Sequence, residues 1–243
     1  MFTSKLNKFD VLGILLVIFL FILLGLSLGI QASNLWKINL PIKTLFNDIL
    51  FSFLRVSITA VIAWISGICI GYLLCHHRVL NKIFLPSINF IRHISPFAWL
   101  PFAILWFGLG EAPVAFIMFI TLFFPTLIAA SDNFANIPHE YIDEAKVSGA
   151  SQFQLWKYIE LPLTFINHLN LFRIIWGLGW SVIIAAEMLG VNTGLGFRLL
   201  DFRYLLKYKE MVIYLVVMGF MGIVVDYILR RIIFCLKIKM FGK

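Results

Sequence analysis

Apolar stretches of about 20 residues constrain this chain more than any other feature, because the hydrocarbon core of a bilayer takes about that length of helix. Residues Val11–Ile30 and Ala112–Ser131, for example, contain no charged side chain. Hydrophobic residues make up 61% of the chain and charged residues 13%, against about 25% charged residues in soluble domains. We therefore expect the bilayer to be the solvent for most of this chain, folded as one membrane domain over residues 1–243.

The apolar stretches predict an all-α fold, a polytopic membrane protein with about six transmembrane helices. The third stretch is short for a span and contains Pro96 and Pro101, so we expect it to be tilted or partly re-entrant. The predicted helices are Phe9–Ile30, Phe51–Cys75, Pro96–Gly108, Ala112–Ser131, Asn170–Gly190 and Met211–Phe234.

The first stretch also has the basic flank of a secretory signal, since Lys5 and Lys8 precede it. Its apolar run is longer than the core of a typical signal peptide, and residues 31–33 make a poor cleavage site. A retained first membrane helix is therefore the preferred interpretation.

The Lys and Arg residues predict the orientation, because cytoplasmic loops are enriched in them. With both termini in the cytoplasm, most of the 20 Lys and Arg residues fall on the inner side. The basic stretch Arg198–Lys209 falls outside, and we expect it to lie at the membrane interface as an amphipathic helix. This topology accounts for the formal net charge of +8 without a nucleic-acid partner.

The segment Asp132–Leu169, called the polar segment below, lies between the fourth and fifth predicted helices. It is polar and sizeable, so we expect it to face the cytoplasm and to contact another protein. Pro138 is suited to open a helix there, and Pro162 is predicted to break the next helical stretch. Gly149 reaches positive φ without steric cost, so it is predicted to end one helix and redirect the chain.

The polar segment contains small residues followed by large apolar ones, a combination that suits a protein partner. Ala145 and Ala150 allow a partner surface to approach closely. Phe153, Leu155 and Trp156 are apolar anchors of the kind that dominates binding energies at interfaces. On periodicity alone, an ordinary amphipathic loop packed on its own chain remains the alternative.

The spacing in this segment resembles the cytoplasmic loop of the permease subunits of bacterial ABC importers. That loop reads Glu-Ala-Ala, three residues, Gly, nine residues, then Ile-x-Leu-Pro. The matching positions here are Asp143, Glu144, Ala145, Gly149, Ile159, Leu161 and Pro162. Asp143 and Glu144 depart from the family residues, which affects the contacts expected at that end of the loop.

The rest of the chain extends the resemblance over roughly residues 50–235. Three further elements are similar to the nitrate, sulfonate, taurine and bicarbonate branch of these permeases. They are Trp106-Phe107-Gly108, Ala185-Ala186-Glu187-Met188 and Gly194-Leu195-Gly196.

The resemblance implies a transport subunit in the cytoplasmic membrane of a bacterium, surrounded by lipid and carrying a small anionic solute. It implies a loop, with Ala150 and Phe153 among its contacts, that docks on an ABC-type ATP-binding subunit. Two copies of the chain would assemble with two such subunits, and an extracytoplasmic solute-binding protein would deliver the solute. The chain itself would bind no cofactor, since ATP and Mg²⁺ would be used by the partner.

Charged residues inside apolar stretches are candidates for the pathway or its gate. Glu187 lies in the run Ile183–Val191, and such residues face protein or water. Arg173 is fourteen positions away on the same predicted helix, about 21 Å, so a partner for Glu187 must come from another helix or a second copy.

Two further charged sites have mainly structural interpretations. Arg55 is expected to extend toward the lipid headgroups, with a substrate role as the alternative. Asp226 and Arg230 are spaced four apart, which predicts an ion pair on one face of the last helix.

The sequence contains no G-x-x-x-x-G-K-[ST] phosphate loop, no G-x-S-x-G and no H-E-x-x-H. We therefore expect no enzymatic activity in this chain and no metal site; the three cysteines have no metal-binding spacing. A stand-alone channel or an intramembrane enzyme remains the alternative to a transport subunit.

Overall fold

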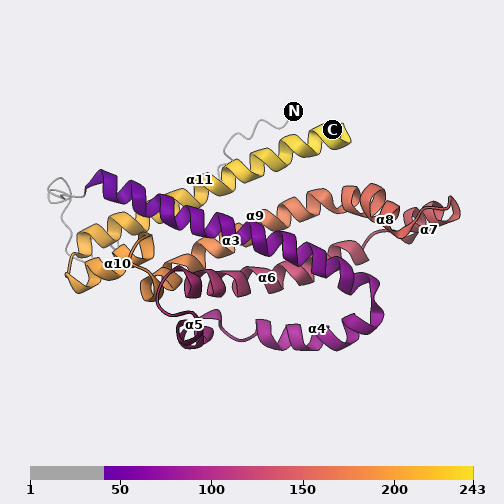
Figure 1. Ribbon diagram of the computed structural model, residues 1–243. Coiled ribbons are helices and arrows are strands. Elements are labelled where there is room, and N and C mark those ends of the chain that lie inside the picture. Colours follow the sequence, from indigo (N-terminus) through magenta and orange to yellow (C-terminus); the bar gives the residue numbers. More distant parts are fainter. Residues whose placement is uncertain (1–40, 243) are drawn as a thin grey trace.

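The computed structural model describes residues 41–242 (Figure 1). The predicted helix Phe9–Ile30, its signal-peptide alternative and the N-terminus lie outside the described residues. Within the described part, helices joined by short turns make up the fold, so the all-α prediction is confirmed there.

Four described helices are long and apolar enough to span a membrane. Each extends beyond the apolar stretch that predicted it, because backbone hydrogen bonding continues into the polar flanks of an apolar run. They are α3 (Ile42–His76), α6 (Glu111–Ala135), α9 (Leu161–Gly190) and α11 (Tyr208–Phe241).

A bent pair of helices lies where the short third span was predicted. Helix α4 (Arg78–Arg92) is followed by the 3₁₀ turn η1 (Pro96–Trp99) and by α5 (Leu100–Phe107), and the two limbs meet at 90°. The break lies at Ser95, whose ψ of 130° is extended as expected before a proline. Counted as one broken span, the pair brings the candidate spans in the described residues to five. The sequence analysis did not predict α4.

The polar segment is helical in large part. Helix α7 (His139–Val147) is followed by α8 (Gln152–Leu155) and by a π-helical turn, η2 (Trp156–Glu160), which runs directly into α9. The prediction that the fifth helix begins at Asn170 is therefore wrong, since one helix continues from Gln152 to Met188.

The predicted break at Pro162 is wrong for the same reason. Proline lacks an N–H and its ring clashes with the carbonyl four residues earlier, here that of Tyr158. Tyr158 lies in the wider π-helical turn, and this turn accommodates the ring without ending the helix.

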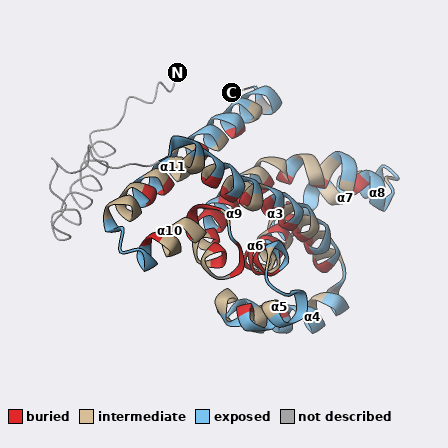
Figure 2. Cartoon of the chain, turned by 60° about the vertical axis from the view of Figure 1, so that its left-hand side comes forward, coloured by how far each residue is buried: buried red, intermediate tan, exposed pale blue. Residues whose placement is uncertain are grey.

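The core lies where α3, α6 and α9 meet, as the buried residues in Figure 2 show. Close packing of α3 on α6 depends on two glycines of α3. A Cβ at Gly67 would lie 2.7 Å from Thr126 Cγ2, and one at Gly71 would lie 2.8 Å from the Leu127 carbonyl oxygen. By contrast, only 17% of the most apolar part of α11 is buried, against 44% for α6.

The chain leaves α9 through a short turn into α10 (Leu195–Tyr204), which packs on α9 and α11 before α11 begins. Helix α10 therefore covers only residues 198–204 of the predicted interfacial stretch Arg198–Lys209. The amide of Gly110 donates to the Gly190 carbonyl oxygen at 2.9 Å, which joins the start of α6 to the end of α9.

Candidate functional site

Two features of this fold are candidates for function, one at each end of the bundle: the polar segment, and a group of buried polar side chains around Arg55. In Figure 1 the helices α7 and α8 extend beyond the bundle at the end where α3 finishes and α4 begins. The start of α6 and helix α10 lie at the opposite end, called the Arg55 end below.

The turn between α7 and α8 is built by backbone and side-chain caps. Gly149 has a φ of +81°, and the amides of Gly149 and Ala150 donate to the carbonyl oxygens of Lys146 and Ala145, both at 3.0 Å. These are the bonds of a Schellman motif, which requires a left-handed residue at Gly149. The predicted role of Gly149 in ending a helix is therefore confirmed.

Helix α8 starts with a capping box. The Ser151 amide donates to Gln154 Oε1 at 2.8 Å, and the Gln154 amide donates to Ser151 Oγ at 3.4 Å. Because both helix ends of this turn are capped, α7 is held in a defined direction relative to α8.

Most side chains on α7 face away from the chain. No residue of α7 is buried, Asp143 and Glu144 are exposed, and Ala145 is half-buried. At the end of the helix, Val147 is 90% exposed.

The predicted apolar anchors fall into two groups. Phe153 is 64% exposed, whereas Leu155 is buried in the chain's own bundle and Trp156 is half-buried. The idea that Leu155 faces a partner is therefore wrong, because the turn of α8 directs it inward, whereas a partner contact by Trp156 stays a prediction. Of the remaining motif residues, Ile159, Leu161 and Pro162 are half-buried.

A group of inward-facing side chains fastens the polar segment to α3. Buried Glu160, on the π-helical turn, lies 2.9 Å from Nε2 of His76 at the end of α3. Tyr72, one turn earlier, packs against His76, Trp156 and Phe134. The polar segment is therefore joined to α3 by side-chain contacts as well as to α9 by a continuous helix.

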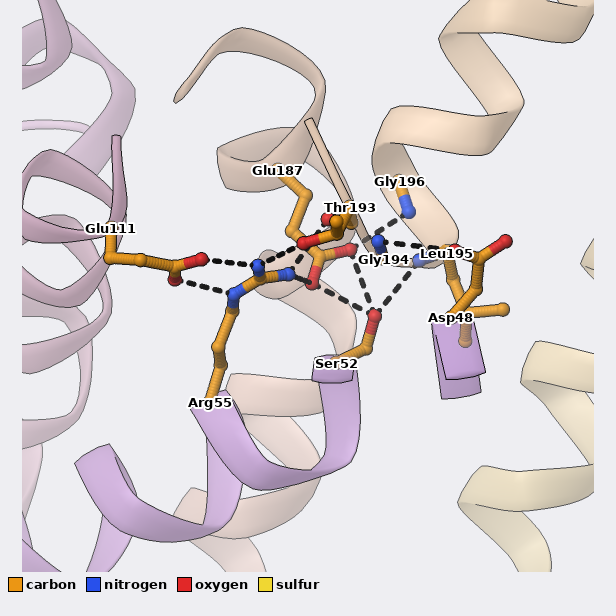
Figure 3. Close-up of polar contacts among 9 residues, drawn as sticks. All are labelled: Asp48, Ser52, Arg55, Glu111, Glu187, Thr193, Gly194, Leu195 and Gly196. Carbon is orange, nitrogen blue, oxygen red and sulfur yellow. Dashed lines mark hydrogen bonds and ion pairs between the residues drawn. The ribbon is translucent and has the colours of Figure 1, made fainter. Parts of the chain in front are cut away.

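At the opposite end, the Arg55 cluster consists of Ser52, Arg55, Glu111, Glu187 and Thr193 (Figure 3). Arg55 Nη1 donates to Glu187 at 2.6 Å and to the Thr193 carbonyl oxygen at 2.8 Å. Its Nη2 donates to Thr193 Oγ1 at 2.7 Å and to Glu111 at 2.6 Å, and Nε donates to Glu111 at 2.7 Å. Arg55 thus uses all five of its N–H donors inside the chain.

Glu187 is fully buried, and its carboxylate is saturated from three directions. It accepts hydrogen bonds from Arg55, from Ser52 Oγ at 2.8 Å and from the Gly196 amide at 2.9 Å. A side chain at Gly194 would collide with this carboxylate, and one at Gly196 would collide with the Ile184 carbonyl oxygen. The two glycines therefore allow the turn after α9 to close over Glu187.

A neighbouring polar group continues from the Arg55 cluster to α10 and α11. Buried Asp48 accepts hydrogen bonds from Arg198 Nε and from the Tyr214 hydroxyl, both at 3.0 Å. Burial disfavours the charged guanidinium most strongly, but the hydrogen bond to Asp48 and the neighbouring charges of Asp48, Tyr214 and Asp201 together outweigh it, so the pKa of Arg198 lies above its ordinary value. Arg198 is thus joined to α3 through Asp48, and the placement of this stretch at the membrane interface stays a prediction.

The structure also bears on several sequence-based expectations about charged residues. Arg55 does not extend toward the lipid headgroups, because its side chain is only 10% exposed and Glu187 and Glu111 hold it. The partner of Glu187 is thus Arg55 of the same chain. Arg173, a candidate for the pathway, instead lies 2.5 Å from Asp226 on α11. Asp226 also lies 3.2 Å from Arg230, the pair that the spacing predicted.

Sequence reasoning missed Asp48, Ser52, Glu111 and Thr193. A signal was present for two of them, since Asp48, Ser52 and Arg55 are spaced four and three residues apart and so share one face of a helix. That face is a polar stripe within an otherwise apolar span. Among residues 41–242, no group of three or more His, Cys, Asp and Glu side chains is arranged to hold a metal ion.

Comparison with known proteins gives related sequences in transport systems. The chain is 33% identical over 191 residues to an ABC transporter permease protein of Methanocaldococcus jannaschii, covering 78% of this chain and 71% of that protein. It is 32% identical over 186 residues to the bicarbonate transport system permease protein CmpB of Synechococcus elongatus, covering 76% of this chain and 66% of the relative. It is 30% identical over 154 residues to the taurine transport system permease protein TauC of Escherichia coli, covering 63% and 56%.

A solved structure has the same fold. An inward-facing conformation of the MetNI methionine ABC transporter matches with a TM-score of 0.70 at 16% identity, covering 84% of this chain and 98% of that chain. The family described as "Binding-protein-dependent transport system inner membrane component" matches residues 61–237. The chain therefore belongs to this family, as a multi-pass, non-catalytic permease subunit of an ABC importer.

Proposed function

We propose that this permease subunit receives the work of ATP hydrolysis through the polar segment and carries a small anionic solute. The observation that carries the first part is the exposure of α7, a helix with no buried residue at the end of an otherwise apolar bundle. Exposed Val147 and Phe153 give it apolar contacts for a partner. The partner is the ABC-type ATP-binding subunit that a permease of this family works with.

The route from the partner to the bundle follows from the contacts of the polar segment. The Schellman motif and the capping box make α7 and α8 move as one piece. Leu155 and Glu160 then anchor that piece inside the bundle, Glu160 through His76 of α3. Closure of two ATP-binding subunits would thus displace α3 and α9, the helices that also carry Arg55 and Glu187. ATP and Mg²⁺ stay with the partner.

This route links the two ends of the bundle. The Arg55 cluster connects α3, α6 and α9 through ion pairs that span 56 and 132 positions in the chain. A displacement of α3 relative to α9 must stretch or break those bonds. The cluster would therefore stabilise one of the two states of the gate. In this proposal Arg55 and Glu187 act at the gate, and Arg173 and Asp226 fasten α9 to α11.

The proposed orientation places the polar segment and the end of α11 in the cytoplasm, and the Arg55 end outside. Lys146, Lys157, Arg230 and Lys237 lie toward the polar-segment end, which fits the enrichment of basic residues on the cytoplasmic side. The description of the family as binding-protein-dependent supports delivery of the solute at the Arg55 end by an extracytoplasmic binding protein. A second copy of the chain would complete the pathway.

The solute class rests on the relatives. Their printed names refer to bicarbonate, nitrate and taurine, at 29% to 32% identity. All three are small, and each carries an oxyanion group. We therefore propose a small oxyanion as the solute.

The test compares two equally drastic substitutions at exposed apolar residues on opposite ends of the bundle. Val147→Arg lies on the proposed docking surface, and Leu109→Arg, at a residue 79% exposed, lies at the Arg55 end. The tagged chain is expressed with its ATP-binding subunit, and both the recovery of that subunit and the uptake of labelled nitrate, bicarbonate and taurine are measured.

We expect Val147→Arg to reduce recovery of the ATP-binding subunit at least tenfold, which corresponds to about 1.4 kcal/mol of binding. Leu109→Arg should leave recovery unchanged. Full recovery with Val147→Arg, or an equal loss with both variants, would show that α7 is not the docking element. Uptake of all three solutes by the chain without ATP would favour a channel instead.

A further inference from the structure

Arg92 and His93 lie at the break between α4 and α5, exposed on the surface of the single chain. The depth of this break in the membrane matters, because a charge is tolerated at the interface but is costly against lipid at the bilayer centre.

The depth follows from the contacts of α4. Buried Ile88 packs with Leu127 of α6 and Leu74 of α3. Leu127 is eight residues from Ala135, the end of α6, which is about 12 Å along the helix. Figure 1 shows α4 running back alongside α6 from the polar-segment end, and Arg92 lies one turn beyond Ile88 in that direction, so it is about 18 Å from the end of α6. Since the 25 residues of α6 make a helix about 37 Å long, Arg92 lies close to its midpoint.

Arg92 differs from the arginines inside the long spans. Arg173 pairs with Asp226, and Arg55, nearer the opposite end of the bundle, pairs with Glu187, both inside the chain. For Arg92, no ion pair is formed with any residue in the range 41–242. The sequence from residue 78 to 110 contains no Asp or Glu, so the bent pair carries only positive charge.

A cation at the bilayer centre is not stable against lipid tails, and it faces protein or a water-filled cavity. The three-carbon stem of an arginine is too short to reach the headgroups from there. The face of the break that carries Arg92, His93 and Ser95 is therefore turned toward the interior of the assembled transporter, and not toward lipid.

We propose that this face lines the translocation pathway and that Arg92 is the cation that attracts the oxyanion group of the solute, with the His93 imidazole beside it as a second hydrogen-bonding group. The inference rests on the proposed function, because it takes the solute class from there. A guanidinium suits this task, since it presents paired N–H donors that match carboxylate, sulfonate or nitrate oxygens. The break at Ser95 frees the backbone from the helix at the point where the solute passes, which is tolerated at this depth only against protein or water.

The test measures water access and charge selectivity without knowledge of the solute. Cys69, Cys75 and Cys235 are first replaced by serine, and Ser95→Cys is introduced as a near-isosteric probe on the exposed face. The complex with its ATP-binding subunit is placed in proteoliposomes. Two methanethiosulfonate reagents of similar size are compared, one with a sulfonatoethyl group and one with a trimethylammonioethyl group.

We expect Ser95→Cys to react faster with the anionic reagent. A unit charge about 7 Å away in water changes the rate of a singly charged reagent about threefold, in opposite directions for the two reagents. The ratio of anionic to cationic rates should therefore fall about eightfold when Arg92→Gln is added. Arg92→Lys keeps the charge and should keep the ratio. Ile223→Cys, at an exposed position on α11, serves as the lipid-facing control and should react with neither reagent.

Ionic strength provides a second measurement that needs no change at Arg92. Raising the salt from about 10 mM to about 1 M shortens the Debye length from ~30 Å to ~3 Å, so the rate ratio at Ser95→Cys should fall toward that of Arg92→Gln. A Ser95→Cys thiol as unreactive as Ile223→Cys in the presence and absence of ATP would overturn the inference. So would a rate ratio that is unchanged both by Arg92→Gln and by salt.

The two proposals fail in different ways. If the unsubstituted chain does not retain an ATP-binding subunit, the proposed function is overturned and this inference falls with it. If the complex is intact and hydrolyses ATP but shows no charge effect at Ser95→Cys, only the inference about Arg92 is overturned.

Discussion

At the scale of single residues, Arg55 shows how a charge is kept inside a membrane span. Its five N–H donors are all used within the chain, by two carboxylates and by both oxygens of Thr193. An anionic solute would have to displace Glu111 or Glu187 to reach it. The exposed Glu111 is the easier group to release, so in the proposed gate a change would begin on the Glu111 side of the cluster.

The two carboxylates on Arg55 should therefore contribute very differently to stability. Glu187→Ala leaves Arg55 and the Gly196 amide without a buried acceptor, and we expect a loss of about 3–5 kcal/mol in the free energy of unfolding. Glu111→Ala removes a carboxylate whose side chain is 66% exposed, so the loss should stay below about 1 kcal/mol. Thermal or denaturant unfolding of the purified chain in mild detergent measures both. Equal losses would show that the buried ion pair is not the main contribution.

At the scale of helices, small residues set how closely α3 approaches α6. This is the packing that membrane helices use, because lipid tails supply no hydrophobic force between helices. A Cβ at Gly67 or Gly71 would lie only 2.7 to 3.2 Å from atoms of Thr126, Leu127 or Ala130 of α6. The same two helices carry Arg55 and Glu111, so their spacing also fixes the Arg55 cluster.

We expect Gly71→Val to destabilise the bundle by about 1–3 kcal/mol, since the added carbons collide with the backbone of Leu127 and with Ala130. Gly219→Val on α11 is the matched control. A Cβ at Gly219 has nothing within 4 Å, and replacing glycine inside a helix removes a small cost. The melting temperature of each variant in detergent checks the expectation. If Gly219→Val lowered it as much as Gly71→Val, the loss would come from the substitution itself and not from the contact of α3 with α6.

At the scale of the whole molecule, the described spans alternate in direction when the bent pair of α4 and α5 is counted as one span, and the polar segment and the end of α11 lie at one end of the bundle (Figure 1). The polar segment at this end contains Lys146 and Lys157, and the last turns of α11 add Lys237 and Lys239. With the proposed orientation, this end lies in the cytoplasm.

A labelling experiment on vesicles tests that orientation. In the chain without native cysteines, Val147→Cys should react with an impermeant thiol reagent only in inside-out vesicles. Leu206→Cys, in the turn between α10 and α11, should react only in right-side-out vesicles. Both positions are more than two thirds exposed, so access is not limited by burial. The reverse pattern would place the polar segment outside and would contradict docking on an ATP-binding subunit.

The sequence by itself determined the solvent and the class of this protein. Long apolar runs with few charges leave only membrane spans, and α3, α6, α9 and α11 all contain a run that was predicted. The Gly149 turn was also predictable, because a Schellman motif depends on local backbone conformation and on residues within one turn. The spacing from Asp143 to Pro162 pointed to the transporter family, which the family match to residues 61–237 confirms.

Only the tertiary structure decided which charges meet and where the helices end. Arg55 and Glu187 are 132 positions apart, so their contact depends on the rotation of α3 and α9, which apolar composition does not specify. Hydropathy likewise missed α4, whose basic and apolar residues are mixed along the sequence and separate only onto different faces of the helix. The continuation of α9 through Pro162 depends on a π-helical turn, and burial of Glu160 against His76 at the end of α3 holds that turn in place.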